Sequence, residues 1–143
     1  MYKLFVCTFL FSLIALFTSS SFAQDMNDYH VVHIQTFKMT ENLGDDAESF
    51  NEMLKRQAEV VKGDDRVLRS YVLRHNWGAD SRDLVFVAEF ASEGDLFAFY
   101  NDMNDLFEKA FSKEQLDKDN ALWAKHVGQH SDEIYRVVSD TRK

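Results

Sequence analysis

The stretch Arg66–Ala91 reads RVLRSYVLRHNWGADSRDLVFVAEFA, and it decides the fold. In its second half Leu84, Phe86 and Ala88 recur at every other position. The first half is rich in valine and leucine, and turn-forming residues around Gly78 separate the two halves. A period of two is typical of strands, so the stretch predicts two β-strands joined by a turn.

A strand and a helix are predicted before this hairpin. The strand covers Tyr29–Met39 (YHVVHIQTFKM) and has apolar residues on both parities, so we expect both of its faces to be covered. Asp45 or Asp46 can cap the helix, because a short carboxylate accepts hydrogen bonds from free backbone N–H groups. Gly63 is the expected end of the helix. Its apolar residues recur at helical spacing: Ala47, Phe50, Leu54, Ala58 and Val61.

Two helical segments and a last strand are predicted after the hairpin. Ser92 opens the first segment with a capping signature, and Ser112 opens the second in the same way. We expect the second segment to end at Gly128 and the last strand to cover Ser131–Asp140.

The predicted order is therefore β-α-β-β-α-(α)-β. This is the order of the ferredoxin-like α+β fold, in which a four-stranded antiparallel sheet carries helices on one face. Val32, Val72 and Val85 are among the apolar residues that would occupy both faces of the sheet. Because the helices cover one face only, the other needs a partner, and we expect a homodimer.

Residues 1–23 are expected to be a signal peptide. Lys3 precedes the apolar run Leu4–Phe17, and Ser21 and Ala23 place small residues before the expected cleavage after Ala23. An uncleaved anchor is the alternative, although a full membrane span needs about 20 apolar residues. We expect an exported protein, periplasmic or secreted, that has no membrane attachment after cleavage.

The remaining residues 24–143 are predicted to form a single domain, since no proline and no Ser/Gly-rich linker divides them. Once Lys3 is removed, 15 Lys and Arg face 24 Asp and Glu, which gives a net charge of −9. Such a surface repels nucleic acid and anionic lipid, so neither is an expected partner. The single cysteine, Cys7, lies in the signal peptide, so the mature chain has no disulfide.

Taken together, these features resemble the dimeric α/β-barrel superfamily, and within it the antibiotic-biosynthesis-monooxygenase-like domains. The segments that carry the resemblance are YHVVHIQTFKM, HNWGADSRDLVFVAEF and HSDEIYRVV, and it extends over Tyr29–Ser139. It implies two protomers whose sheets press together into a barrel, with a pocket between each sheet and its helices. It also implies one of several activities: cofactor-independent oxygenation of aromatic substrates, haem degradation, or small-molecule binding.

Cofactors are not expected. The haem-degrading branch of the superfamily uses an asparagine on the first strand, where this chain has His30, His33 and Gln35 instead. His126 and His130 have the four-residue spacing that places two imidazoles on one helical face. However, Gly128 lies between them and the glutamate of an H-E-x-x-H site is absent, so we expect no metal.

A candidate pocket follows from the first strand. Alternate residues of a strand share a face, so His33, Gln35 and Phe37 are predicted to point together into the space between sheet and helices. His33 is the candidate acid–base group, because imidazole titrates near neutral pH. The other predicted pocket residues are Tyr71, Phe86, Trp123 and His126. The alternative is that His33 is a packed residue whose nitrogens are satisfied by neighbours.

Two functions remain open. The first is an exported small-molecule protein of the monooxygenase-like type, which binds or oxidises a compact apolar or aromatic ligand. The second is a non-catalytic homodimeric module that binds a ligand or stabilises a partner. The chain has no G-x-S-x-G motif and no glycine-rich phosphate loop, which disfavours familiar hydrolases and nucleotide enzymes. A filled gap between sheet and helices would favour the second function.

Overall fold

The computed structural model describes residues 29–40, 42–78, 80–138 and 141. The predicted signal peptide, residues 1–23, lies outside the described residues. The elements are β1 (Val31–Met39), η1 (Gly44–Asp46), α2 (Ala47–Lys62), β2 (Val67–Arg74), β3 (Asp83–Phe90), α3 (Glu93–Ala110), α4 (Lys113–His126) and β4 (Val127–Arg136). Within the described part of the chain, no helix has the length and apolarity needed to cross a membrane.

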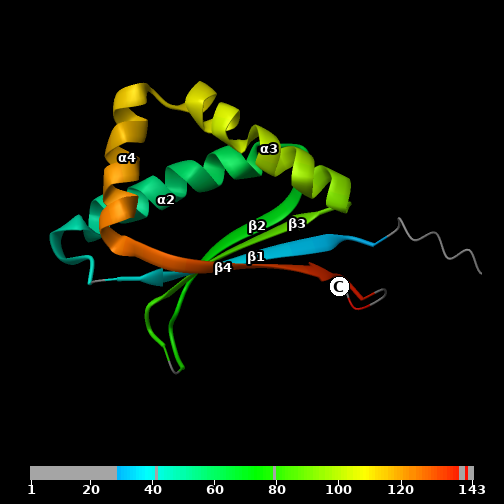
Figure 1. The fold of residues 1–143 in the computed structure, drawn as a ribbon, viewed down its shortest axis with the longest axis horizontal. Helices are drawn as coiled ribbons and strands as arrows, with labels where there is room; N and C mark the ends of the chain where they lie inside the picture. The colour runs from blue at the N-terminus through cyan, green and yellow to red at the C-terminus, as the bar shows by residue number, and fades with distance from the viewer. Residues whose placement is uncertain (1–28, 41, 79, 139–140, 142–143) are drawn as a thin grey trace, which may run out of the picture.

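The four strands form one sheet in the order β2-β3-β1-β4, and every neighbouring pair is antiparallel. The three α-helices lie on one face of this sheet, whereas the β2–β3 hairpin extends beyond it on the other side (Figure 1). The predicted ferredoxin-like α+β fold is confirmed.

The register of the strands shows which side chains the helices cover. On β1, Val31 pairs with Phe90 and Phe37 pairs with Leu84. Phe90 and Leu84 are buried against the helices, so the odd-numbered side chains of β1 share the helix-covered face. The even-numbered side chains, such as that of Ile34, therefore lie on the face that no helix of this chain covers, which we call the open face.

The core consists of two hydrophobic clusters. The first joins β1, β3 and α3 through Val31, Ala88, Phe90, Leu96 and Phe99. The second joins α2 and β3 through Phe50, Met53, Leu54 and Leu84. Residues of both clusters, including Phe99 of the first and Leu54 of the second, line a cavity between the sheet and the helices.

Side chains at the helix N-termini are partly as predicted. Ser92 Oγ accepts a hydrogen bond from the Asp95 backbone N–H at 3.1 Å, and Ser112 Oγ caps α4 in the same way. Asp46 occupies the N-cap position of α2, but its side chain makes no capping hydrogen bond. Its carboxylate instead binds Lys125 and His126, at the C-terminal end of α4.

Gly128 corrects one prediction, because it lies in β4 and does not end the preceding helix. The α4 helix ends at His126, and the strand begins at once with Val127. A Cβ at Gly128 would lie 2.8 Å from Thr40 Cγ2, so the glycine permits β4 to pass close to the end of β1. The glycine is needed for space between strands. As a consequence, His126 and His130 lie on different elements.

Candidate functional site

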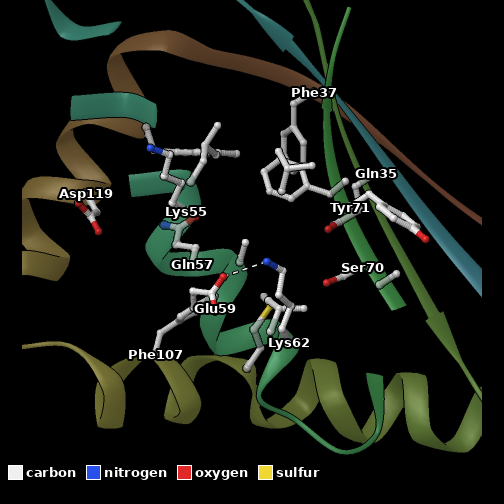
Figure 2. Close-up of a pocket in the computed structure, with 18 of the residues that line it drawn as sticks. Gln35, Phe37, Lys55, Gln57, Glu59, Lys62, Ser70, Tyr71, Phe107 and Asp119 are labelled. Carbon is white, nitrogen blue, oxygen red and sulfur yellow. Dashed lines mark hydrogen bonds and ion pairs between the residues drawn. The ribbon is translucent and has the colours of Figure 1, made fainter. Parts of the chain in front are cut away.

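A cavity of about 870 Å³ lies between the helices and the sheet, where β2 and β3 face α2, α3 and α4. Figure 2 shows side chains from these elements converging on it. Its apolar lining includes Phe37, Leu54, Val72, Phe86, Phe99, Met103, Phe107 and Trp123. Pockets for small molecules commonly measure roughly 300–1,000 Å³ and are mostly apolar, so this one is large enough for a compact ligand.

Three aromatic side chains form one wall of the cavity. Phe37 contacts Phe86 edge-to-face with ring centroids 5.5 Å apart, and Trp123 with centroids 5.0 Å apart. Trp123 also stacks on Phe50, a fully buried residue of α2. Edge-to-face contacts favour fixed ring orientations, so this wall presents a rigid apolar surface suited to a flat molecule.

A chain of polar side chains leads from the cavity to the protein surface. Tyr100, on α3, lines the cavity, and its hydroxyl lies 2.7 Å from His33 Nδ1. His33 Nε2 lies 3.2 Å from an oxygen of Asp132, on β4. The second oxygen of Asp132 lies 3.0 Å from Nε2 of His130, which is exposed. Gln35 Nε2 donates to Asp132 at 2.8 Å.

The Asp132 carboxylate determines which ring nitrogen of neutral His33 carries the proton. An ionised carboxylate only accepts hydrogen bonds, so His33 Nε2 carries the proton and donates it to Asp132. His33 Nδ1 must then accept, and the Tyr100 hydroxyl donates to it. This arrangement leaves the lone pairs of the Tyr100 oxygen available to a ligand in the cavity.

Burial shifts the pKa of the His33 imidazole and the pKa of the Tyr100 hydroxyl. His33 is 7% exposed, and burial lowers the pKa of its imidazole, although the nearby Asp132 carboxylate opposes the shift. Burial, assisted by the negative charge of Asp132, raises the pKa of Tyr100 to about 12. At neutral pH the pair therefore consists of a neutral imidazole and a protonated phenol.

The predicted site residues are brought together in part. Gln35, Phe37, Phe86 and Trp123 line the cavity. Tyr71 also touches it, but the register pairs Tyr71 with Val87 and its neighbour Val72 with Phe86. Its side chain therefore belongs to the open face, where it is 54% exposed. His33 is on the helix-covered face, but Tyr100 stands between it and the cavity lining.

His126 lies apart from the cavity lining and belongs to another contact. Its Nε2 lies 2.7 Å from Asp46, which also binds Lys125. Hydrogen bonds from Lys125 and His126 lower the pKa of the Asp46 carboxyl. His126 is almost fully buried, and its ring meets Phe50 edge-to-face. These contacts join the end of α4 to the start of α2, which is a structural role.

Among the described residues, no three His, Cys, Asp or Glu side chains are grouped closely enough to hold a metal ion. His126 and His130, the pair considered for a metal, contact different carboxylates, Asp46 and Asp132 respectively. The expectation that the protein binds no metal stays a prediction.

Tyr100 and Asp132 were not identified as site residues from the sequence. Tyr100 is adjacent to the core residue Phe99 on α3, and helical periodicity does not separate a cavity wall from a packed core. Asp132 pairs with β1 across 97 residues of chain, through Gln35, so only the strand pairing reveals it.

Comparisons with known structures support the fold. No protein-family model matches the chain, and no curated protein matches its sequence. Solved structures do. One match is a Burkholderia xenovorans protein with a NIPSNAP-like domain, with a TM-score of 0.57 at 11% identity. The aligned region covers 81% of this chain and 91% of the Burkholderia protein. Another is a Caulobacter crescentus protein named as a candidate antibiotic biosynthesis monooxygenase, with a TM-score of 0.56 at 17% identity. The aligned region covers 79% of this chain and 93% of the Caulobacter protein.

A third similar structure is a Mesorhizobium loti protein of the dabb family with a ferredoxin-like fold. Its TM-score is 0.50 at 14% identity, and the match covers 78% of this chain and 99% of its own. This chain shares their fold. The predicted resemblance to ferredoxin-like, antibiotic-biosynthesis-monooxygenase-like proteins is therefore confirmed at the level of the fold.

Proposed function

We propose that this protein binds a compact apolar or aromatic molecule in the cavity and exchanges a proton with it through Tyr100 and His33. The observation that carries the proposal is a cavity with a rigid aromatic wall and, beside it, a hydroxyl connected by hydrogen bonds to the surface. A filled interior would have supported a purely structural module, and the cavity supports ligand binding instead.

The proton relay favours a chemical role over simple binding. A ligand hydroxyl can donate to the Tyr100 oxygen while the Tyr100 proton moves to His33 Nδ1. The resulting imidazolium is stabilised by Asp132, 3.2 Å from Nε2. Loss of a proton makes a phenol or an enol richer in electrons and easier to oxidise, so the relay is compatible with an oxidising activity of the monooxygenase-like type.

Homodimerisation through the open face is part of the proposal. Two rows of paired side chains cross β2, β3 and β1 on the open face. The first row is Tyr71, Val87 and Ile34, and the second is Leu73, Val85 and Thr36. Tyr71 and Leu73 are about half exposed in the single chain. Burial of apolar surface is worth about 25 cal/mol per Å², so pairing two open faces would stabilise both copies.

Export is also proposed, on the basis of the sequence pattern of residues 1–23. The test is to express the full chain in a bacterium and to determine the mass of the product in the periplasm and the medium. A product that begins at Gln24 is expected. A full-length product held in the membrane fraction would contradict export and release.

The cavity is tested by filling it. Ala58, on α2, lines the cavity, so Ala58→Phe should abolish binding of planar aromatic compounds found in a ligand screen. The matched control is Ala98→Phe, because Ala98 is exposed on α3 and does not line the cavity. Binding that survives Ala58→Phe would place the ligand elsewhere and contradict the proposal.

The relay is tested by His33→Gln, which keeps the approximate size of a neutral imidazole. Lost turnover or lost binding of the screened ligand at an unchanged melting temperature supports the proposed role. A lowered melting temperature, with no ligand found for the parent protein, would show that His33 is a structural residue.

A further inference from the structure

Most cationic side chains of this acidic protein are matched by a carboxylate. In the described ranges, all Lys and Arg side chains form ion pairs except Arg69, Arg74 and Lys109. Of these three, Arg74 alone lines the cavity. One of the three unpaired cations therefore lies at the candidate site.

The other charges on the cavity lining are balanced. Lys55 pairs with Glu52 at 2.7 Å, and Lys62 pairs with Glu59 at 2.9 Å. Asp119, which is 4% exposed, accepts hydrogen bonds from Arg56 and Gln115, both at 2.8 Å. With these pairs neutralised, Arg74 contributes the single unmatched charge among the described residues that line the cavity.

Arg74 is held in place without a carboxylate. It is the last residue of β2 and pairs with Leu84, which places it on the helix-covered face. Its guanidinium carbon lies 5.7 Å from the centre of the Phe50 ring, within the range of a cation–π contact. Arg74 is exposed and also borders a smaller hollow of about 520 Å³, so it stands where the cavity meets solvent.

We infer that the cavity ligand is an apolar or aromatic carboxylic acid, whose carboxylate is bound by Arg74. This inference rests on the proposed function and specifies its ligand class. A guanidinium binds a carboxylate through two parallel hydrogen bonds. Asn51, which follows Phe50 on α2, also lines the cavity and carries an amide group. The remaining surface is acidic, so an anionic group is accommodated best beside Arg74.

The test uses two probes of nearly the same size and shape, 2-naphthoate, which carries a negative charge, and 2-naphthamide, which is neutral. The mature protein with Trp77→Phe retains one tryptophan, Trp123, on the cavity wall, since the chain has two tryptophans in total. Trp77 is 93% exposed, so its replacement should not disturb the fold. Quenching of Trp123 fluorescence, checked by calorimetry, then reports binding of each probe.

We expect 2-naphthoate to bind at least about tenfold more tightly than 2-naphthamide, as one charged hydrogen bond suffices for a factor of this size. Arg74→Gln should remove this advantage, because it should weaken binding of 2-naphthoate far more than binding of 2-naphthamide. Lys109→Gln removes the same charge from an exposed, unpaired site on α3 and should alter neither affinity.

Each other outcome is informative. Equal affinities of the parent protein for the two probes would overturn the carboxylate site and leave the proposed ligand cavity standing. Equal weakening by Arg74→Gln and Lys109→Gln would overturn the assignment of Arg74, since net charge would then explain the effect. Failure of both probes to bind would contradict the inference and the proposed function together.

Discussion

On β1 the odd-numbered and even-numbered side chains meet different surroundings. Val31, His33 and Phe37 lie under the helices, where they contact buried aromatic and aliphatic residues or Tyr100. Val32 and Ile34 point to the open face, where their neighbours on adjacent strands include Val87 and Tyr135. One strand thus contributes to two apolar surfaces, of which the chain covers one by itself.

We therefore propose a different role for each face. The helix-covered face holds the cavity and the hydrogen-bonded chain from Tyr100 to Asp132, so it is the face proposed for ligand binding and proton exchange. The open face holds rows of aliphatic and aromatic side chains, such as Ile34 and Val87, so it is the face proposed for association. Changes on the two faces should therefore alter different measured properties.

The largest effect is expected from a charge at the centre of the open face. Val87→Asp would bury an unpaired carboxylate in each copy of the proposed dimer, and an uncompensated buried charge costs roughly 3–5 kcal/mol. Light scattering at micromolar concentration should show a dimer for the parent and a monomer for the variant. The control is Phe97→Asp, at an exposed phenylalanine of α3 away from the sheet. A parent protein that is monomeric would contradict this role of the open face.

A large-to-small change under the helices should lower stability rather than association. Phe90 is fully buried between β1 and α3, so Phe90→Ala is expected to lower the free energy of unfolding by about 3–5 kcal/mol. Leu73→Ala, on the open face of the monomeric Val87→Asp protein, should lower it by less than about 1 kcal/mol. Denaturant titration measures both. Similar losses from the two changes would show that the faces are not distinct in the monomer.

A hydroxyl group distinguishes the faces on a smaller scale. Tyr100→Phe leaves His33 Nδ1 buried without its donor, which should cost about 1–3 kcal/mol of unfolding free energy. The control is Tyr135→Phe on the open face, where the hydroxyl bonds to the exposed Glu133 and its loss should have no measurable effect. Loss of stability from the control alone would reverse our assignment.

The smallest expected effect is a dependence on pH. Burial lowers the pKa of His33 in the folded protein below its ordinary value of 6.5, so the unfolded chain takes up a proton that the folded protein does not. Stability should therefore fall as the pH drops through 6.5 toward the lower folded pKa. His33→Gln should make this part of the curve flatter. A parent protein that gains stability over the same range would contradict a buried, neutral His33.

The sequence predicts the elements well because local physics determines them. The alternation in Asp83–Phe90 and the serine caps at Ser92 and Ser112 act over a few residues, and the structure confirms each of them. Gly128 was misinterpreted because a glycine near the end of a helix pattern usually stops the helix. Here it permits close contact with Thr40, which is 88 positions earlier in the chain and outside any local pattern.

The site was predicted less completely, since it depends on how strands and helices meet. Alternation along β1 places His33, Gln35 and Phe37 on one face, but does not reveal that Tyr100 lies between His33 and the cavity. Alternation along β2 also does not tell which parity faces the helices. The antiparallel register decides it, and it selects Val72 instead of Tyr71.

The most direct test of the roles proposed for the two faces, ligand binding under the helices and dimerisation through the open face, is a crystal structure of the mature protein grown with 2-naphthoate. We expect two copies joined sheet to sheet through their open faces, with the naphthalene ring against Phe37, Phe86 and Trp123 in each copy. A structure in which side chains fill the space beneath α2 while the open face remains in solvent would contradict these roles.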